Sequence, residues 1–277
     1  MTEEVLRFLK NPQNFQNSQR RTLKEMKKKE VIQSPLLILK NVSKNFGGIK
    51  ALNNVSFSVP HGKIIAVIGP NGSGKSTLFH VISGLYELDR GEIYFQNENI
   101  TGLEDFIISR KGISRTFQEV RLFKHLTVRE HLEIALQLTD EKLFASLFRA
   151  QFEHETTIQE LLKLFKLDNH LKNYAHDLSY GQRKLLDLAV ALAKPHKILM
   201  LDEPVAGIHH ELRVEIAGIL KNLRKRGETI LLIEHDMNFV MNLADYIYVL
   251  DYGKVIASGK PREIKNNEKV LEAYLGK

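Results

Sequence analysis

The segment GPNGSGKST, residues 69–77, has the residue types and spacing needed to bind phosphate. It fits the pattern G-x-x-x-x-G-K-[ST] and lies between an apolar run at 63–69 and the helical pattern KSTLFHVISGL, which ends at Gly84. Its glycines let successive backbone N–H groups converge on phosphate oxygens, and the Lys75 ammonium neutralises their charge. The Ser76 hydroxyl is a candidate Mg²⁺ ligand, and Thr77 adds phosphate contacts. We call residues 69–77 the phosphate loop; its candidate nucleotide-binding residues are Gly69, Pro70, Asn71, Gly72, Ser73, Gly74, Lys75, Ser76 and Thr77.

Two adjacent carboxylates follow a second apolar run, ILMLDE at 198–203. Mg²⁺ takes octahedral oxygen coordination from few protein ligands, so a phosphate loop needs an acidic partner to complete the metal shell. Asp202 is placed to hold the metal, directly or through water. Glu203 is placed to accept the proton of an attacking water molecule or to orient that water.

His235 and Gln118 are weaker candidates. His235 follows the apolar run TILLIE, and the exits of neighbouring parallel strands are where such sheets bind ligands, so a γ-phosphate contact is one interpretation. An ordinary structural histidine is the other interpretation. Gln118, within SRTFQEV, can contact both a metal and a water molecule, but by itself it indicates nothing.

The stretch LSYGQRKLLDLAVALAKP, from Leu178 to Pro195, forms a second anion-binding pattern. A small-residue turn runs directly into a helix, whose free N–H groups and positive dipole end attract anions. The phosphate loop lies about a hundred residues earlier, so the sequence raises the question of which phosphate this second site serves.

The surrounding elements alternate between strand and helix. Strand patterns cover 36–59, with a turn at Gly47-Gly48, then 63–69, 91–96, 197–203 and 229–235, and a hairpin at 246–259 turns at Tyr252-Gly253. Capping boxes at Thr127 and Thr157 predict two helix starts in a block, about 119–176, that has little strand signal. The order predicts an α/β sheet with an antiparallel edge and a helical insertion.

Composition limits the class of protein. The 277 residues are 43% hydrophobic, and no apolar run approaches the roughly 20 residues of a membrane span. No secretory signal is visible, and the absence of cysteine excludes disulfides and fits a cytosolic protein. Of the net charge of +7, residues 1–34 carry +4 (eight Lys/Arg against four Asp/Glu), which indicates a basic appended segment, solvated or docking, rather than a DNA-reading surface. A short helix at Glu3–Lys10 within a solvated segment is one interpretation, and an amphipathic docking helix is the other.

Taken together, these motifs resemble the ATP-binding-cassette (ABC) ATPases. The family's elements occur in order: an aromatic before the phosphate loop (Phe46), the Walker A loop at 69–77, Gln118, the signature LSYGQ at 178–182, Walker B at 198–203 and the switch residue His235. The resemblance implies a RecA-like P-loop NTPase core with an antiparallel β subdomain and an inserted α-helical subdomain. Composition and Ser34-Pro35 separate an N-terminal extension, 1–34, and the resemblance makes 35–277 an ABC ATPase domain, with the helical subdomain at about 119–185.

The resemblance also implies an answer to the second anion site. In this family two cassettes meet head-to-tail, and each ATP lies between one chain's Walker A loop and the other's signature. The residues facing the partner's ATP are then Leu178, Ser179, Tyr180, Gly181 and Gln182. The implied catalytic residues are Glu203, His235 and Gln118, and Mg²⁺ is held by Ser76, Gln118 and Asp202, with ATP and Mg²⁺ as cofactors.

A finer resemblance is to the ATPases of branched-chain amino acid importers. It is carried by SRTFQEVRLFKHLTVREHL at 114–132 and by the segments around the signature and the C-terminus. It implies a second ATPase subunit, two transmembrane permeases, an extracytoplasmic binding protein and a peripheral place on the cytoplasmic face of the membrane. The alternatives are a urea or short-chain amide importer of the same branch, a non-transport ABC ATPase and an unrelated phosphate-loop kinase. Tyr180 and His209 depart from the family pattern, which usually has Gly and Asp at these positions.

Overall fold

The computed structural model describes residues 34–137 and 147–275. The predicted N-terminal extension and its helix at Glu3–Lys10 lie outside the described residues, apart from Ser34. Within the described ranges, no helix is long and apolar enough to cross a membrane.

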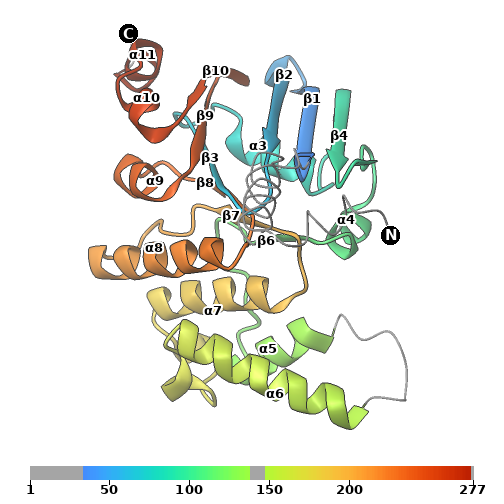
Figure 1. The fold of residues 1–277 in the computed structure, drawn as a ribbon, viewed down its shortest axis with the longest axis vertical. Coiled ribbons are helices and arrows are strands. Elements are labelled where there is room, and N and C mark those ends of the chain that lie inside the picture. Colours follow the sequence, from blue (N-terminus) through green and yellow to red (C-terminus); the bar gives the residue numbers. More distant parts are fainter. Residues whose placement is uncertain (1–33, 138–146, 276–277) are drawn as a thin grey trace, which may run out of the picture. The chain divides into compact units, whose positions relative to one another are not determined.

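The central element of the described chain is a six-stranded sheet in the order β10-β9-β3-β8-β7-β6 (Figure 1). All neighbouring strands are parallel except β9 and β10, which form the predicted hairpin. This arrangement confirms the predicted α/β sheet with an antiparallel edge. The strands are β3 (Ile64–Ile68), β6 (Ile113–Arg115), β7 (Ile198–Asp202), β8 (Ile230–Ile233), β9 (Tyr246–Asp251) and β10 (Lys254–Gly259).

Alternate residues of the central strands face two different hydrophobic cores. In β3, Ile64, Ala66 and Ile68 join one core, while Ile65 and Val67 join the other. Strands β7 and β8 alternate in the same way. Burial on both faces explains why these strands read as continuous apolar runs in the sequence.

A second sheet, antiparallel and four-stranded among the described residues, covers one face with the order β2-β1-β4-β5. It turns at Gly47-Gly48 as predicted, and it shares a core with helix α3 (Lys75–Ile82). This sheet is the antiparallel β subdomain of the predicted fold class. Its strands are β1 (Leu37–Phe46), β2 (Ile49–Val59), β4 (Arg90–Phe95) and β5 (Glu98–Asn99).

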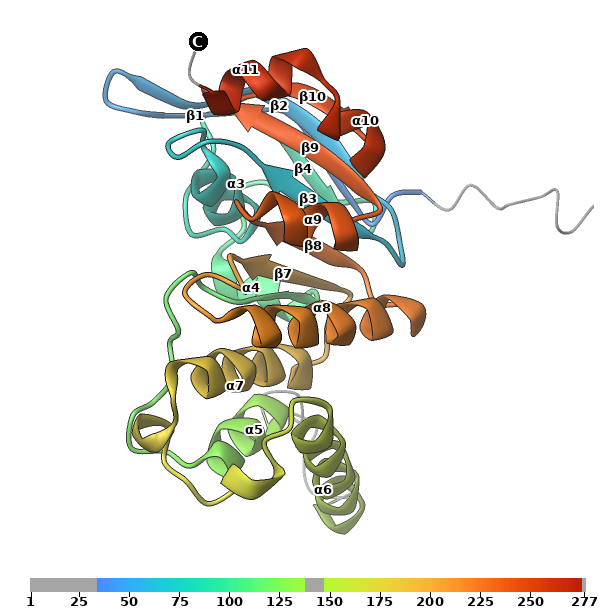
Figure 2. The ribbon, with the colours of Figure 1, turned by 90° about the vertical axis from the view of Figure 1, so that its left-hand side faces the viewer.

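The other face is covered by helices. Figures 1 and 2 show α8 (His210–Lys225) beside α7 (Tyr180–Ala193), and α5 (Val128–Gln137) with α6 (Leu147–Leu164) on the far side of α7. Helices α5, α6 and α7 pack on one another and form the helical insertion. The other α-helices of the described residues are α4 (Asp105–Arg110), α9 (Met237–Leu243), α10 (Pro261–Lys265) and α11 (Glu268–Leu275), and short 3-10 helices cover Asp168–His170 and Ala175–Asp177.

One of the two predicted capping boxes is correct. Thr127 N–H donates to Glu130 Oε2 at 2.7 Å and Glu130 N–H donates to Thr127 Oγ1 at 3.2 Å, so α5 begins at Val128. The box at Thr157 is wrong, because α6 begins at Leu147 and Thr157 lies inside it. A Thr and a Glu three residues apart also occur on the surface of a continuing helix, where no terminus needs them. Strand β6 was not predicted, since three residues are too few to show alternation.

Candidate functional site

The phosphate loop connects β3 to α3, and close backbone packing requires two of its glycines. A Cβ atom on Gly69 would lie 2.0 Å from the carbonyl oxygen of Leu250 in β9. A Cβ atom on Gly74, where φ is +103°, would lie 2.3 Å from the carbonyl oxygen of Ala51 in β2. No side chain fits at such separations, so the loop is held between the two sheets by glycine contacts.

Lys75 begins α3 and is buried, with 6% of its surface exposed. Its Nζ donates hydrogen bonds to the carbonyl oxygens of Gly69 and Pro70, both at 2.9 Å. Burial lowers the pKa of the Lys75 ammonium, and the nearby charges of Glu203 and Asp202 oppose that shift. The structure thus brings the phosphate-loop lysine close to both predicted carboxylates.

Asp202 ends β7 and is 3% exposed. Its Oδ2 forms an ion pair with Arg115 at 3.1 Å, whereas its Oδ1 is buried with no hydrogen-bond partner among the described residues. Burial raises the pKa of Asp202, and the Arg115 guanidinium opposes that shift. A buried carboxylate oxygen without a partner fits a hard cation such as Mg²⁺.

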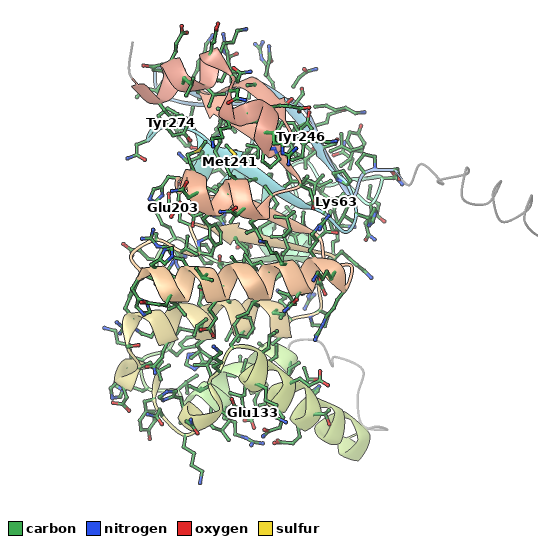
Figure 3. All side chains as sticks on the ribbon, turned by 60° about the vertical axis from the view of Figure 1, so that its left-hand side comes forward. Lys63, Glu133, Glu203, Met241, Tyr246 and Tyr274 are labelled. Carbon is green, nitrogen blue, oxygen red and sulfur yellow. The ribbon has the colours of Figure 1, made fainter. Side chains whose placement is uncertain are left out.

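Gln118 and His235 flank the carboxylate of Glu203, which is labelled in Figure 3. Gln118 Nε2 donates to Glu203 Oε2 at 3.1 Å, and His235 Nδ1 lies 3.6 Å from Glu203 Oε1. Glu203 has a left-handed backbone, with φ +48°, a conformation that costs energy in a non-glycine residue and clusters at functional sites. Three side chains predicted from separate parts of the sequence therefore meet at the ends of β7 and β8.

Lys184, on α7, is a buried residue that the sequence analysis missed. It is 2% exposed, and its Nζ donates to the carbonyl oxygens of Gln118 at 2.9 Å and Glu203 at 3.3 Å. Burial lowers its pKa, which the charges of Asp187 and Glu234 oppose. The helix that follows the signature is thus tied directly to the Gln118 and Glu203 backbone. In the sequence, only its position beside the buried leucines and alanines of α7 points to this role.

Glu234 is a second missed residue, and it organises the turn that carries His235. Its carboxylate is fully buried, and it accepts hydrogen bonds from the backbone N–H groups of Val205 at 3.0 Å and His235 at 3.1 Å. Glu234 therefore connects the segment after Glu203 to the segment that presents His235.

The signature segment, residues 178–182, forms the N-terminus of α7. Ser179 is the N-cap: its hydroxyl accepts from Gln182 N–H at 3.3 Å, and its own N–H donates to Gln182 Oε1 at 2.9 Å. Leu178 is buried in the core. In the described part of the chain, no hydrogen bond or ion pair joins residues 178–182 to the phosphate loop.

The two departures from the family pattern lie in neighbouring segments. A Cβ atom on Gly207 would lie 3.2 Å from the ring of Tyr180, so this tyrosine packs over the segment that leads to His209. His209 is the N-cap of α8, and its exposed Nδ1 lies 3.4 Å from the Leu212 backbone nitrogen and 2.8 Å from Glu211 Oε2.

Phe46 lies at the end of β1 with 42% of its surface exposed. Its ring meets Tyr86 edge to face at a centroid distance of 5.3 Å, and Lys44 Nζ lies 5.4 Å from its centroid. Tyr86 was not predicted as part of an aromatic site, because its contact with Phe46 joins segments forty residues apart.

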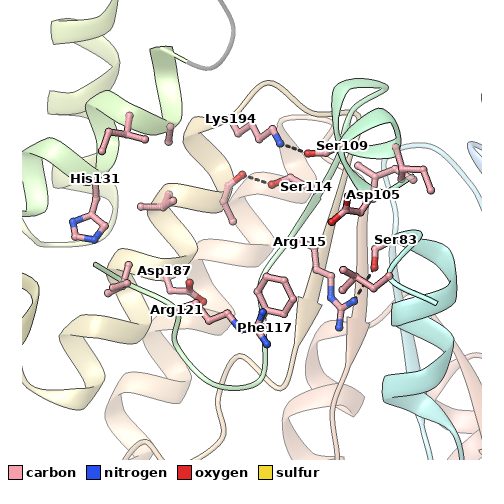
Figure 4. Close-up of a pocket in the computed structure, with 18 of the residues that line it drawn as sticks. Ser83, Asp105, Ser109, Ser114, Arg115, Phe117, Arg121, His131, Asp187 and Lys194 are labelled. Carbon is pink, nitrogen blue, oxygen red and sulfur yellow. Dashed lines mark hydrogen bonds between the residues drawn. The ribbon is translucent and has the colours of Figure 1, made fainter. Parts of the chain in front are cut away.

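A groove lies between the predicted helical insertion and the central sheet (Figure 4). It has a volume of about 380 Å³, and its surface is predominantly apolar. Asp187 lies on its wall, and burial raises the pKa of this carboxyl to about 6, with Lys184 opposing the shift. The groove is lined in part by Leu85, Ile108, Phe117, Leu122, Ile134 and Val190.

Comparison with known proteins identifies the family. The family model described as "ABC transporter" matches residues 52–206. The chain belongs to this family. A second model, "Branched-chain amino acid ATP-binding cassette transporter", matches residues 254–277 of the cassette. The cassette is also similar to the probable branched-chain amino acid transport ATP-binding protein LivG of Archaeoglobus fulgidus, with 42% identity over 87% of this chain and 95% of that protein.

Solved structures agree with the family and confirm the predicted fold class. The ADP conformation of MJ1267, an ATP-binding cassette of an ABC transporter, superposes with a TM-score of 0.76 and 36% identity, covering 88% of this chain and 99% of that one. The dimeric structure of MJ0796, a bacterial ABC transporter cassette, superposes with a TM-score of 0.73 and 29% identity, covering 82% and 99%. The chain is therefore an ABC ATPase that binds ATP.

Proposed function

We propose that this cassette hydrolyses Mg·ATP in a head-to-tail dimer to energise the import of branched-chain or other hydrophobic amino acids. The cargo is inferred from the LivG relatives and from the branched-chain family model at the C-terminus. Cargo selection in this scheme belongs to partner proteins, because no cargo contact is assigned to this chain.

The proposal of a dimer rests on one observation. The phosphate loop and the signature segment, the two anion-binding features, share no hydrogen bond or ion pair in the described part of one chain. Within the described ranges, the signature residues bond with one another and with nearby residues such as Ala175, His170 and Arg183, not with the phosphate loop. A phosphate loop and a helix N-terminus that do not meet in one chain can both serve one triphosphate if a second cassette supplies the signature. The dimeric structure of the MJ0796 cassette supports a dimer of this chain.

In the proposed reaction each side chain near Glu203 has a separate role. Glu203 accepts the proton of the attacking water, and Gln118 and His235 restrict where its two oxygens point. His235 also contacts the γ-phosphate. Lys75 exchanges its loop carbonyl partners for phosphate oxygens, and Phe46 contacts the adenine.

The residues near Asp202 fit Mg²⁺, which neutralises phosphate charge when it is bound with ATP. Asp202 Oδ1 is buried and unpartnered, and the Ser76 side chain lies in an exposed position at the start of α3. Gln118 uses Nε2 on Glu203, so its Oε1 remains available as an acceptor. We assign Ser76, Gln118 and Asp202 as the metal ligands.

The proposed partners are a second cassette, two membrane permeases and, through them, an extracytoplasmic binding protein. The groove is the proposed docking site for a cytoplasmic helix of a permease, because its apolar wall needs a cover and Asp187 adds a buried negative charge. We infer that the docking helix carries a basic side chain opposite Asp187. The cassette would then lie peripherally on the cytoplasmic face of the membrane.

Uptake measurements test the proposed cargo. Deletion of the gene should abolish uptake of labelled leucine, and wild-type chain, but not Glu203→Gln at equal abundance, should restore it. Loss of urea uptake with normal leucine uptake would instead assign the cassette to the urea branch. Unchanged uptake of both, with the chain found away from membranes, would favour a non-transport ABC ATPase.

A further inference from the structure

Arg115 carries a buried guanidinium, and the proposed reaction assigns this residue no role. It ends β6, and only 6% of its side chain is exposed. Its guanidinium carbon lies 5.5 Å from the ring centroid of Phe79 and 5.0 Å from that of Phe117. The two rings hold the planar guanidinium from separate elements, α3 and the segment after β6.

The guanidinium bridges two parts of the cassette with separate nitrogens. Its Nη1 donates to Ser83 Oγ at 2.8 Å, a bond drawn in Figure 4, and its Nη2 donates to Asp202 Oδ2 at 3.1 Å. Arg115 therefore links the C-terminal end of α3 to the carboxylate that ends β7. The phosphate loop lies at the opposite end of α3.

This ion pair occupies one oxygen of Asp202 and leaves the other unpaired. Asp202 Oδ1 is buried without a hydrogen-bond partner in the described chain. An isolated buried ion pair seldom adds net stability, because desolvation offsets the attraction. A pair that fixes the direction of a carboxylate, however, prepares its free oxygen for a further cation.

We propose that Arg115 is a positioning residue, which holds Asp202 Oδ2 so that Oδ1 stays available to the cation that accompanies ATP. The inference rests on the proposed assignment of Asp202 to Mg²⁺. Arg115 itself touches neither nucleotide nor metal in this scheme. Its planar fork is what matters, because a lysine keeps the charge but cannot bridge Ser83 and Asp202 with two fixed nitrogens.

The test separates metal affinity from nucleotide affinity. Mn²⁺ binding is measured by electron paramagnetic resonance on the purified cassette with a non-hydrolysable ATP analogue, and nucleotide binding is measured without metal in EDTA. Arg115→Lys should weaken Mn²⁺ binding about five- to tenfold, while metal-free nucleotide affinity stays within about twofold. Ser83→Ala, which removes the second anchor and keeps the charge, should weaken Mn²⁺ binding about two- to threefold.

Arg121→Lys is the matched control. Arg121 also stacks on Phe117, at 3.9 Å, and lines the same groove, but its side chain is exposed and it is not paired with Asp202. It should leave both affinities unchanged. Asp202→Asn tests the underlying assignment: normal Mn²⁺ affinity in that variant would overturn the metal role of Asp202.

Other outcomes bear on Arg115 alone. Weak Mn²⁺ binding in Asp202→Asn together with wild-type binding in Arg115→Lys and Ser83→Ala would overturn the positioning role. If Arg115→Lys weakens metal-free nucleotide binding as much as it weakens Mn²⁺ binding, the positioning role is also overturned, because a general loss of structure predicts that result. If Arg115→Lys does not fold, Ser83→Ala decides the question.

Discussion

The side-chain amide of Gln118 donates to the carboxylate of Glu203 at 3.1 Å, although the two residues lie 85 positions apart in the chain. The same contact region contains His235 on the other carboxylate oxygen and Lys184 beneath the Gln118 and Glu203 backbone. A carboxylate that accepts a hydrogen bond on one oxygen and has an imidazole nitrogen 3.6 Å from the other has fewer orientations available than a free one. This is the geometry that a residue orienting a water molecule needs.

Replacing Glu203 by Gln should separate ATP binding from hydrolysis. The amide keeps the size of the side chain but cannot accept a proton, so phosphate release should fall by about 10²–10⁴-fold. Binding of a fluorescent ATP analogue should remain within a few-fold of wild type, and light scattering should detect a more persistent dimer with ATP. Hydrolysis at the wild-type rate would remove Glu203 from its proposed role.

Replacing Ser179 by Asp should prevent dimer closure without unfolding α7. Asp is as good an N-cap as Ser, so the helix start is preserved, but its negative charge faces the partner's γ-phosphate. ATP binding to the dilute single chain should stay normal, while ATP-dependent dimerisation and ATP hydrolysis should be lost. Ser179→Thr, which keeps the cap without the charge, is the control.

The outcome that contradicts this cross-chain assignment is specific. If Ser179→Asp weakens ATP binding to the monomer as strongly as it weakens dimerisation, the signature serves its own chain's nucleotide.

Local patterns predicted the elements well, because burial and caps leave a signal within a few residues. The run at 63–69 and the glycines after it predicted β3, the phosphate loop and α3, and the Thr127 box predicted α5. The contacts of Arg115 and Lys184 could not be predicted, since each joins segments far apart in the sequence. The wrong prediction of a capping box at Thr157 has a different cause, because Thr157 lies inside α6. A two-residue pattern cannot distinguish a helix start from a helix surface.

A half-buried pair away from the nucleotide, His196 and Glu228, predicts a pH-dependent contribution to stability. Burial lowers the pKa of His196, but the neighbouring Glu228 carboxylate, whose Oε2 lies 3.1 Å from His196 Nε2, and the bond of Nδ1 with the Lys194 carbonyl at 2.7 Å outweigh that effect and raise its pKa overall. The neighbouring His196 ring lowers the pKa of Glu228. The His196 contribution is complete below its unfolded pKa of about 6.5 and is lost as pH rises through the folded value. The Glu228 contribution is lost as pH falls below about 4.5.

Glu228→Gln should therefore destabilise the cassette by roughly 1 kcal/mol near pH 6 and by less at pH 8.5. Urea denaturation at the two pH values measures the difference. Glu211→Gln, which breaks the exposed pair with His209, is the matched control and should change neither curve. Equal destabilisation by Glu228→Gln at both pH values would mean that His196 is not charged in the pair.

Asp187, the carboxylate on the groove wall, gives folding stability a pH dependence of its own, because its pKa is raised. Burial raises the pKa of Asp187 to about 6, and the Lys184 charge opposes the shift only in part. Because the folded value lies above the unfolded value of about 3.9, the folded state binds the proton more tightly and loses stability as pH rises from about 4 to 6. Asp187→Asn carries no charge and avoids this loss. Its stability advantage over wild type should grow by about 1–2 kcal/mol between pH 4.5 and pH 7.5. Thermal melts of the isolated cassette would detect this as a difference in Tm of about 3–6 °C.

If a basic permease side chain meets Asp187, the substitution Asp187→Asn should also weaken binding of the cassette to its permeases. If the stability difference between Asp187→Asn and wild type does not change with pH, the Asp187 carboxyl is not buried by the groove and its pKa is not raised.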